Sequence, residues 1–299
     1  MKKLLVILII LCITASLCAD EIIKVDLPQK EAVTLEPYAT FNSDMINESS
    51  GIIKSRSKEN LFWTHNDSGD DARIFPVNRQ GELLVPEWAD EYPGFMIADA
   101  VNIDWEDIAI DNNGNLIIGA CGNNGNARKD LALYLVKEPN PANALASRYF
   151  KKITFFYPEQ DSFPPKKNNF DCEAVFTKDD KIYLLTKNRA NDNTTLYRFD
   201  SMSQDQRNPL TKLGKFRTMG DVTAADCSPD GKKLAILTYN NIWLFQVDNG
   251  DDFFHGKISW LPIKAKQCEA ICFDKNKLLI TNEQMELFEV PLDSLIEIN

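Results

Sequence analysis

The sequence predicts an all-β protein of the β-propeller class with five blades. A short strand-like phrase recurs five times, and each copy is followed by a turn and two more apolar strands. The clearest copies lie at residues 105–108, 172–175 and 268–271, and residues 49–52 and 222–225 occupy the same place without the carboxylate. Such repeats indicate one supersecondary unit that is stacked or arranged in a ring.

Within each unit the elements follow in a fixed order. After the opening strand, a turn is expected at residues 57–60, 111–114, 178–180, 228–231 and 274–276. Asn, Asp and Gly favour turns there because they form local hydrogen bonds or adopt positive φ. A second, apolar strand is expected at 61–64, 116–119, 182–185, 234–237 and 278–281. A third strand is expected at 73–77, 133–136, 196–199, 242–245 and 287–290. Short strands joined by tight turns are typical of antiparallel meanders.

Four of the intervening stretches can supply a fourth, outer strand, most plainly 153–156 and 257–260. Four-stranded sheets repeated around an axis are propeller blades. The last unit lacks its own outer strand, so we expect the N-terminal segment 22–27, or the stretch 38–41, to supply it and remove an open edge. The alternative is a sixth, degenerate blade within 78–103 or 137–170.

The N-terminus has the pattern of a secretion signal. Lys2 and Lys3 precede an apolar run at 4–13, and a cut is expected near Cys18 or Ala19. The run is shorter than the about 20 residues that span a bilayer. We therefore expect a signal peptide at 1–19, a single propeller domain at 20–299, and export to the periplasm or the medium. An uncleaved anchor and lipidation at Cys18 are the alternatives.

The charge of the predicted mature chain is strongly acidic. Without Lys2 and Lys3, 31 basic residues face 44 acidic residues, a net charge of −13. This charge repels phosphate backbones, so nucleic acid is not expected as a partner, whereas cations would be tolerated or attracted. The plainer interpretation is that acidity keeps an exported protein soluble. No later stretch is apolar enough to cross a membrane, and we expect a monomer.

Five cysteines follow the predicted signal, and their number is odd. The spacing of Cys268 and Cys272, with no paired histidine, does not make a zinc ribbon. We expect small buried side chains on strands, with one disulfide as the alternative.

Several motifs resemble those of a family of exported bacterial β-propellers, similar to phytase-like esterase and TolB-like propellers. They lie at residues 63–69 (WTHNDSG), 104–109 (DWEDIA), 50–52 and 128–139. The resemblance implies a propeller and suggests hydrolase activity. The sequence departs from the family at 119–124, where two carboxylates of an acidic loop are absent.

Because inner strands line the channel of a propeller, equivalent positions in different blades should converge on its axis. One predicted ring holds Ser50, Glu106, Glu173, Thr223 and Glu269. A second ring holds His65, Cys121, Lys187, Tyr239 and Asn282, with Asn66, Asn188, Asn240, Glu283, Asp67 and Arg189 close to it.

Three carboxylates facing one channel repel each other unless something neutralises them. A hard cation such as Ca²⁺ could be held by Glu106, Glu173 and Glu269, since Ca²⁺ takes carboxylate, amide and water oxygens. Lys187 or Arg189 could neutralise them instead, or each Glu could accept backbone N–H bonds and tie neighbouring blades together. The predicted ligand-binding residues are His65, Asn66, Asp67, Glu106, Glu173, Lys187, Arg189 and Glu269.

His65 could act as a general base, oriented by Asp67, with Ser68 as nucleophile. The alternative is a local turn capped by Asp67, and no Gly-x-Ser-x-Gly elbow is present. The sequence therefore favours an exported binding or interaction protein that takes a cation, small molecule or protein at an acidic channel mouth. A metal-assisted hydrolase of phosphate or carboxyl esters is the alternative, and a purely structural part in an envelope assembly is a third.

Overall fold

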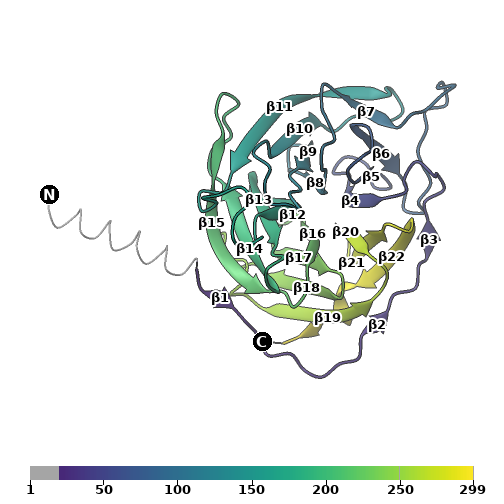
Figure 1. The fold of residues 1–299 in the computed structure, drawn as a ribbon. Helices are drawn as coiled ribbons and strands as arrows, with labels where there is room; N and C mark the ends of the chain where they lie inside the picture. The colour runs from purple at the N-terminus through teal and green to yellow at the C-terminus, as the bar shows by residue number, and fades with distance from the viewer. Residues whose placement is uncertain (1–19, 249, 299) are drawn as a thin grey trace.

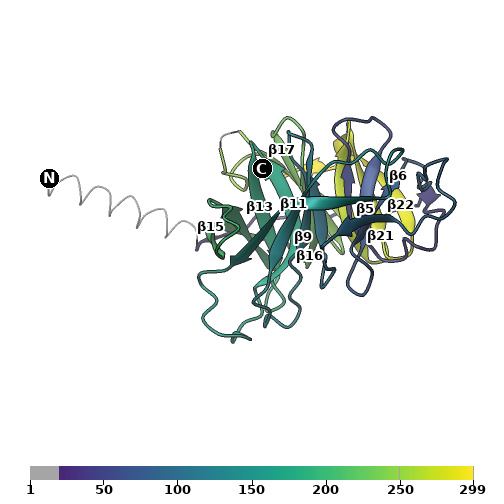
Figure 2. The same cartoon turned by 90° about the horizontal axis from the view of Figure 1, so that it is seen from above.

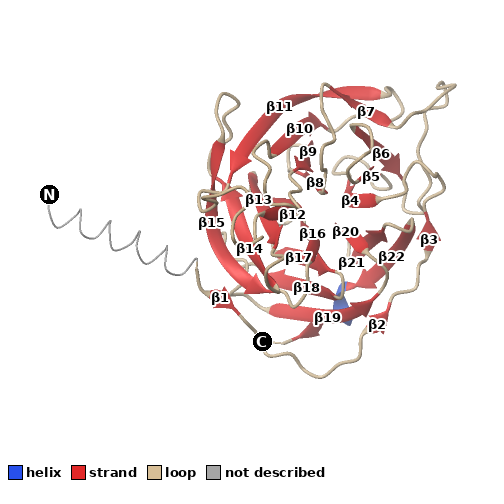
Figure 3. Ribbon diagram, in the orientation of Figure 1, coloured by secondary structure: helices blue, strands red, loops and turns tan. Residues whose placement is uncertain are grey.

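The computed structural model describes residues 20–248 and 250–298, so the predicted signal peptide at 1–19 lies outside it. The all-β prediction is confirmed: the described residues form strands, and their one helical element is the 3₁₀ turn η1 (Leu292–Ser294). No helix in this part of the chain has the length and apolarity needed to cross a membrane. Figure 3 shows strands throughout, with loops gathered at their ends.

Four antiparallel meanders follow one another along the chain. The first contains β4 (Ser49–Lys54), β5 (Phe62–Asn66), β6 (Arg73–Val77) and β7 (Phe95–Ala98). The second contains β8 (Asp107–Ile110), β9 (Asn115–Ala120), β10 (Ala132–Lys137) and β11 (Ala146–Phe156). The third contains β12 (Asp171–Lys178), β13 (Lys181–Lys187), β14 (Asn193–Phe199) and β15 (Asn208–Arg217). The fourth contains β16 (Val222–Cys227), β17 (Lys233–Thr238), β18 (Asn241–Gln246) and β19 (Ile258–Lys264).

The fifth sheet joins the two ends of the chain. Its first three strands are β20 (Cys268–Asp274), β21 (Lys277–Asn282) and β22 (Glu286–Pro291). The fourth is β3 (Ala39–Thr40), which pairs antiparallel with β22. The stretch at 38–41 thus takes the place predicted for an N-terminal strand.

The other N-terminal candidate, 22–27, does not pair with β22. β1 (Ile22–Ile23) lies parallel to β15, and β2 (Val33–Thr34) lies parallel to β19. The short β23 (Ile296–Glu297) also pairs with β19. The segment before β3 therefore passes around the outside of the sheets, as Figure 1 shows.

The arrangement is propeller-like. The sheets surround a common centre, with β4, β8, β12, β16 and β20 innermost and β20 beside β4 (Figure 1). Figure 2 shows the same strands in the view turned by 90°, with loops extending beyond their ends. The long connections at 78–103 and 137–170 contain the outer strands β7 and β11.

Apolar and aromatic side chains fill the space between the sheets. Trp63, Trp105 and Trp243 are fully buried in these layers. The five described cysteines are buried free thiols, which agrees with the prediction of small side chains on strands. Burial of this apolar surface holds the sheets in place and thereby fixes the inner strands around the centre.

Candidate functional site

A β-bulge explains the fixed position in the sequence repeat. The strand pairing shifts between Ser49 and Gly51, Cys172 and Ala174, Val222 and Ala224, and Cys268 and Ala270. The skipped residues are Ser50, Glu173, Thr223 and Glu269, four members of the first predicted ring. A bulge leaves one residue unpaired and re-aims its side chain. In the second sheet Glu106 directly precedes β8, and its backbone N–H donates to the Gly119 carbonyl at 3.0 Å.

These positions open on a polar cavity of about 160 Å³ at the centre of the ring. The lining residues are Glu48, Ser50, Asp67, Glu106, Asn124, Glu173, Lys187, Arg189, Tyr239, Glu269 and Glu283. They include six carboxylates and two cationic side chains. Thr223 is not among them, because its hydroxyl donates to the Cys268 carbonyl at 2.8 Å. Six of the eight predicted ligand-binding residues therefore lie around one space; His65 and Asn66 do not.

The strand register explains where His65 lies. His65 pairs with Gly51, beyond the bulge, whereas Lys187 pairs with Asp171, before it. The predicted equivalence of His65 with Lys187 is therefore wrong by two residues. By the same register, Asp67 of the first sheet occupies the position that Lys187 occupies in the third sheet.

His65 is an interior residue. Its ring is fully buried and packs edge-on against Trp105, with ring centroids 5.8 Å apart. Burial lowers the pKa of His65, so the imidazole is neutral at physiological pH. A base without access to the cavity does not fit the hydrolytic role considered for His65. The Asp67 carboxylate accepts a hydrogen bond from the Ser68 backbone N–H, which is the local turn of the alternative interpretation.

The Asn66 side chain is engaged in hydrogen bonds that hold the loop after β5 and the segment before β4. Its Nδ2 donates to the Met45 carbonyl at 2.7 Å and to Asp70 at 2.8 Å, and its Oδ1 accepts from the Glu48 N–H at 3.3 Å. With these bonds the amide holds the segment before β4 against the end of β5.

One side of the cavity is neutralised by the protein itself. Lys187 Nζ lies 3.1 Å from Glu173 Oε2, and Arg189 Nε lies 2.8 Å from Asp171 Oδ2. Arg189 also reaches Glu173 Oε1 at 3.4 Å, and the Asn123 N–H donates to Asp171 Oδ1 at 2.6 Å. Burial, the largest single effect, would lower the pKa of Lys187, but the charge of Glu173 together with Tyr239 and Glu269 outweighs it and raises this pKa. The lysine is a permanent buried cation.

Glu269 has a different partner. Its Oε1 accepts a hydrogen bond from the Tyr239 hydroxyl at 2.9 Å. Burial raises the pKa of Glu269 to about 7, against the opposing charge of Lys187. Glu269 is one of the three carboxylates predicted to bind a metal, but it is not a member of either group of closely spaced carboxylates, Asp67–Asp104–Glu106 or Glu106–Asp171–Glu173.

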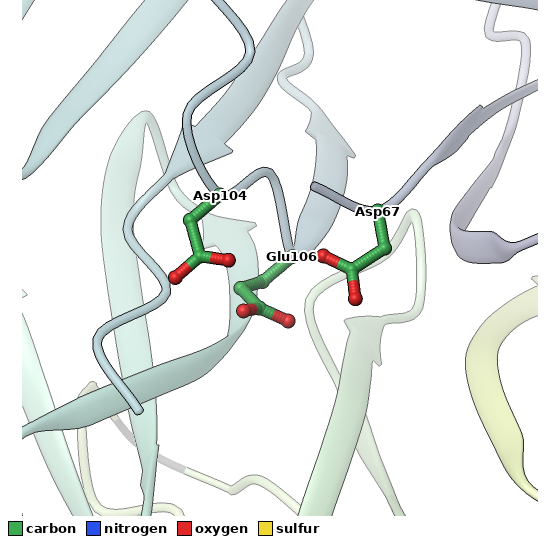
Figure 4. Close-up of side chains that lie close together, drawn as sticks. All are labelled: Asp67, Asp104 and Glu106. Atoms are coloured by element: carbon green, nitrogen blue, oxygen red, sulfur yellow. The ribbon is translucent and has the colours of Figure 1, made fainter. Parts of the chain in front are cut away.

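Two groups of carboxylates share Glu106. Asp67, Asp104 and Glu106 each offer an oxygen within 4.8 Å of the others, and Figure 4 shows these side chains turned toward one another. Glu106, Asp171 and Glu173 form the second group. Burial, and to a smaller extent the negative charge of Glu173, raises the pKa of Glu106 well above its usual range. Burial, and to a smaller extent the negative charge of Asp67, raises the pKa of Asp104 to about 6.

Asp104 and Asp171 are absent from the predicted site, although the sequence carries a signal for them. Each stands two residues before a ring glutamate. Glu48 and Asp221 hold the same position in the first and fourth units, and only the fifth unit has a neutral residue, Gln267. This second set of acidic residues, next to the first ring, makes the mouth of the channel more widely acidic than the ring residues alone would.

Carboxylates that tie neighbouring sheets together do occur, but they are not the ring glutamates. Asp107 Oδ2 accepts from the backbone N–H groups of Val175 at 2.9 Å and Ala225 at 3.5 Å, and so bridges three sheets. Asp226 Oδ2 accepts from the Phe273 N–H at 2.8 Å. These two residues perform the structural role considered for the glutamates and leave the ring carboxylates facing the cavity.

Comparison with known proteins does not assign an activity. No family model and no curated protein matches the chain. Similar solved structures include a candidate 6-phosphogluconolactonase from Bacteroides uniformis, 13% identical with a TM-score of 0.38 over 84% of this chain and 71% of that one. Another is a catalytically inactive virginiamycin B lyase from Staphylococcus aureus with quinupristin, 15% identical with a TM-score of 0.40 over 81% of this chain and 66% of that one.

Proposed function

We propose that this chain is an exported, five-bladed β-propeller that binds a cation in the acidic cavity on its axis. The five meanders, and the pairing of β3 with β22 from opposite ends of the chain, support a closed ring of five blades. The charged and apolar N-terminal pattern supports export of a single domain at 20–299.

One observation carries the binding function. The Glu106 side chain lines the cavity and is only 6% exposed. Within residues 20–248 and 250–298, no protein group donates a hydrogen bond to its carboxylate or forms an ion pair with it, and the carboxylate faces the cavity. A buried carboxylate without a partner is costly, and such groups are normally paired or coordinate a metal. A cation in the cavity would supply that partner.

The size and donor set of the cavity indicate which cation. Carboxylate, amide and hydroxyl oxygens converge, and the lining side chains include no histidine or cysteine. Hard ions such as Ca²⁺ prefer oxygen donors. A volume of about 160 Å³ suits an ion with its waters, or a small molecule, better than a segment of a protein partner.

The melting temperature of the purified protein, with and without CaCl₂, tests this proposal. A ligand at about 100 times its Kd stabilises a folded protein by about 2.7 kcal/mol. For a domain of this length, that is a rise of about 5 °C. NaCl at the same ionic strength is the control and should give a smaller shift. Equal melting curves in both salts, with no Ca²⁺ heat of binding by calorimetry, would refute the proposal.

A metal-assisted ester hydrolase is the alternative, because a metal held by the same carboxylates would lower the pKa of a bound water. Assays on p-nitrophenyl phosphate and p-nitrophenyl acetate, with Ca²⁺ present, separate the two functions. The binding function predicts no turnover with either compound. Turnover that disappears in Glu106→Gln while the protein stays folded would favour the hydrolase.

A further inference from the structure

Resting on the proposed function, we infer that the cation is a divalent, oxygen-preferring ion seated between Asp67, Asp104 and Glu106, and not at the predicted centre of Glu106, Glu173 and Glu269. These three residues come from two loops that meet at one side of the cavity. Asp67 follows β5, and Asp104 and Glu106 precede β8 (Figure 4).

The spacing of this triad suits such an ion. Its three oxygens lie within 4.8 Å of one another, so a single point lies within about 2.8 Å of all three. Ca²⁺–oxygen distances are 2.3–2.6 Å, which small rotations of the side chains would reach. Waters from the open side of the cavity would complete the coordination.

The distribution of charge selects this side of the cavity. Asp171 and Glu173 already have Arg189 and Lys187, and Glu269 has the Tyr239 hydroxyl. The cation that the described residues place nearest to the triad is Arg128, 3.7 Å from Asp104 Oδ2. Its guanidinium donates instead to the Gly122 carbonyl at 2.6 Å and to Asp130 at 3.1 Å.

Glu106 gives an independent indication of a missing ligand, because this carboxylate is more than nine-tenths buried and unpartnered in the described chain. Gly122 provides the room for these carboxylates. A Cβ at Gly122 would lie 2.0 Å from Glu106 Oε1 and 2.5 Å from Asp104 Oδ2. The missing side chain is therefore what allows the two carboxylates to lie together against the backbone.

Terbium luminescence tests the location of the ion. Trp105 stands between two of the proposed ligands in the sequence, so emission of Tb³⁺ excited through tryptophan reports binding, and Ca²⁺ competition gives its Kd. We expect Asp104→Asn and Glu106→Gln to weaken binding by about tenfold or more, since each removes a charged ligand. Glu269→Gln should weaken it by less than about threefold, because a carboxylate that does not touch the ion acts only through its field.

Asp226→Asn is the matched control, a buried carboxylate outside the cavity, and should leave the Kd unchanged. Circular dichroism checks folding, and Asp104→Asn, whose side chain is 16% exposed, serves if Glu106→Gln does not fold. A loss of affinity in Glu269→Gln or Glu173→Gln as large as in Asp104→Asn would place the ion elsewhere and overturn this inference while leaving cation binding intact. A wild-type protein that binds neither ion would overturn both.

Discussion

Replacing Lys187 by methionine tests the electrostatics of the cavity. Lys187 is 5% exposed and Glu173 is 3% exposed, and they are 3.1 Å apart. Lys187 Nζ also donates to the Tyr239 hydroxyl at 3.2 Å. Methionine keeps most of the length and apolar bulk of lysine, so the change removes the charge and its donated hydrogen bonds and leaves the apolar packing. The Glu173 carboxylate would then lose its nearest cation.

Removing one partner of a buried ion pair costs about 3–5 kcal/mol, because it leaves an uncompensated buried charge. Arg189, 3.4 Å from Glu173 and 33% exposed, remains as a weaker, partly screened partner. We therefore expect the lower end, about 3 kcal/mol. An unfolding entropy of about 2.1 cal/mol/K per residue converts this to a fall of about 5 °C in melting temperature for this chain.

Differential scanning calorimetry at neutral pH measures the change. The double variant Lys187→Met/Glu173→Gln should recover most of the loss, because it removes both charges. Lys257→Met removes a 61%-exposed lysine paired with Glu297 and should change stability little. An unchanged melting temperature in Lys187→Met, or a double variant as unstable as the single one, would refute the reasoning.

Three other changes give distinct outcomes. Burial raises the pKa of Asp226 to about 6 from 3.8. Because the folded state holds this proton more tightly than the unfolded chain, Asp226 alone should contribute a loss of about 3 kcal/mol of stability as pH rises from about 4 to above 6. Asp226→Asn lacks this loss, so the free energy of unfolding in urea should rise relative to that of wild type as pH increases across this interval. A difference between the two proteins that does not change with pH would contradict the raised pKa of Asp226. Gly51→Ala should cost about 1–3 kcal/mol, since its Cβ would lie 2.9 Å from the Ile108 backbone nitrogen, and an unchanged urea midpoint would argue against such close packing. Deleting residues 20–41 removes β3 and exposes the edge of β22, so light scattering should detect self-association, whereas a stable monomer would show that this strand is dispensable.

Much of the fold could be predicted from the sequence because each unit repeats the same local signals. Turn residues separate apolar runs of strand length, and long units of antiparallel strands favour blades over a linear solenoid. The choice between 22–27 and 38–41 for the last outer strand could not be made this way. Both are short and suited to an edge, and only the pairing with Leu287 and Glu286 distinguishes them.

The site could be predicted only in part, because alignment of repeats does not give strand register. The Thr-x-Asn pattern at 64–66 matches that at 186–188, yet the two segments pair at different distances from the bulge. A two-residue difference preserves the face of a strand but moves the side chain along it. His65 therefore lies in the core, and Asp67 takes the place at the cavity. Glu106 lies before a strand rather than in a bulge, yet it is predicted correctly because the phrase at 105–108 aligns with those at 172–175 and 268–271.

Anomalous diffraction can locate the bound ion directly. Crystals of the mature protein soaked in a lanthanide chloride would give strong anomalous density at any occupied hard-cation site. We expect a peak within bonding distance of Asp67, Asp104 and Glu106. Occupied lanthanide sites confined to the outer surface, with none in the axial cavity, would contradict it.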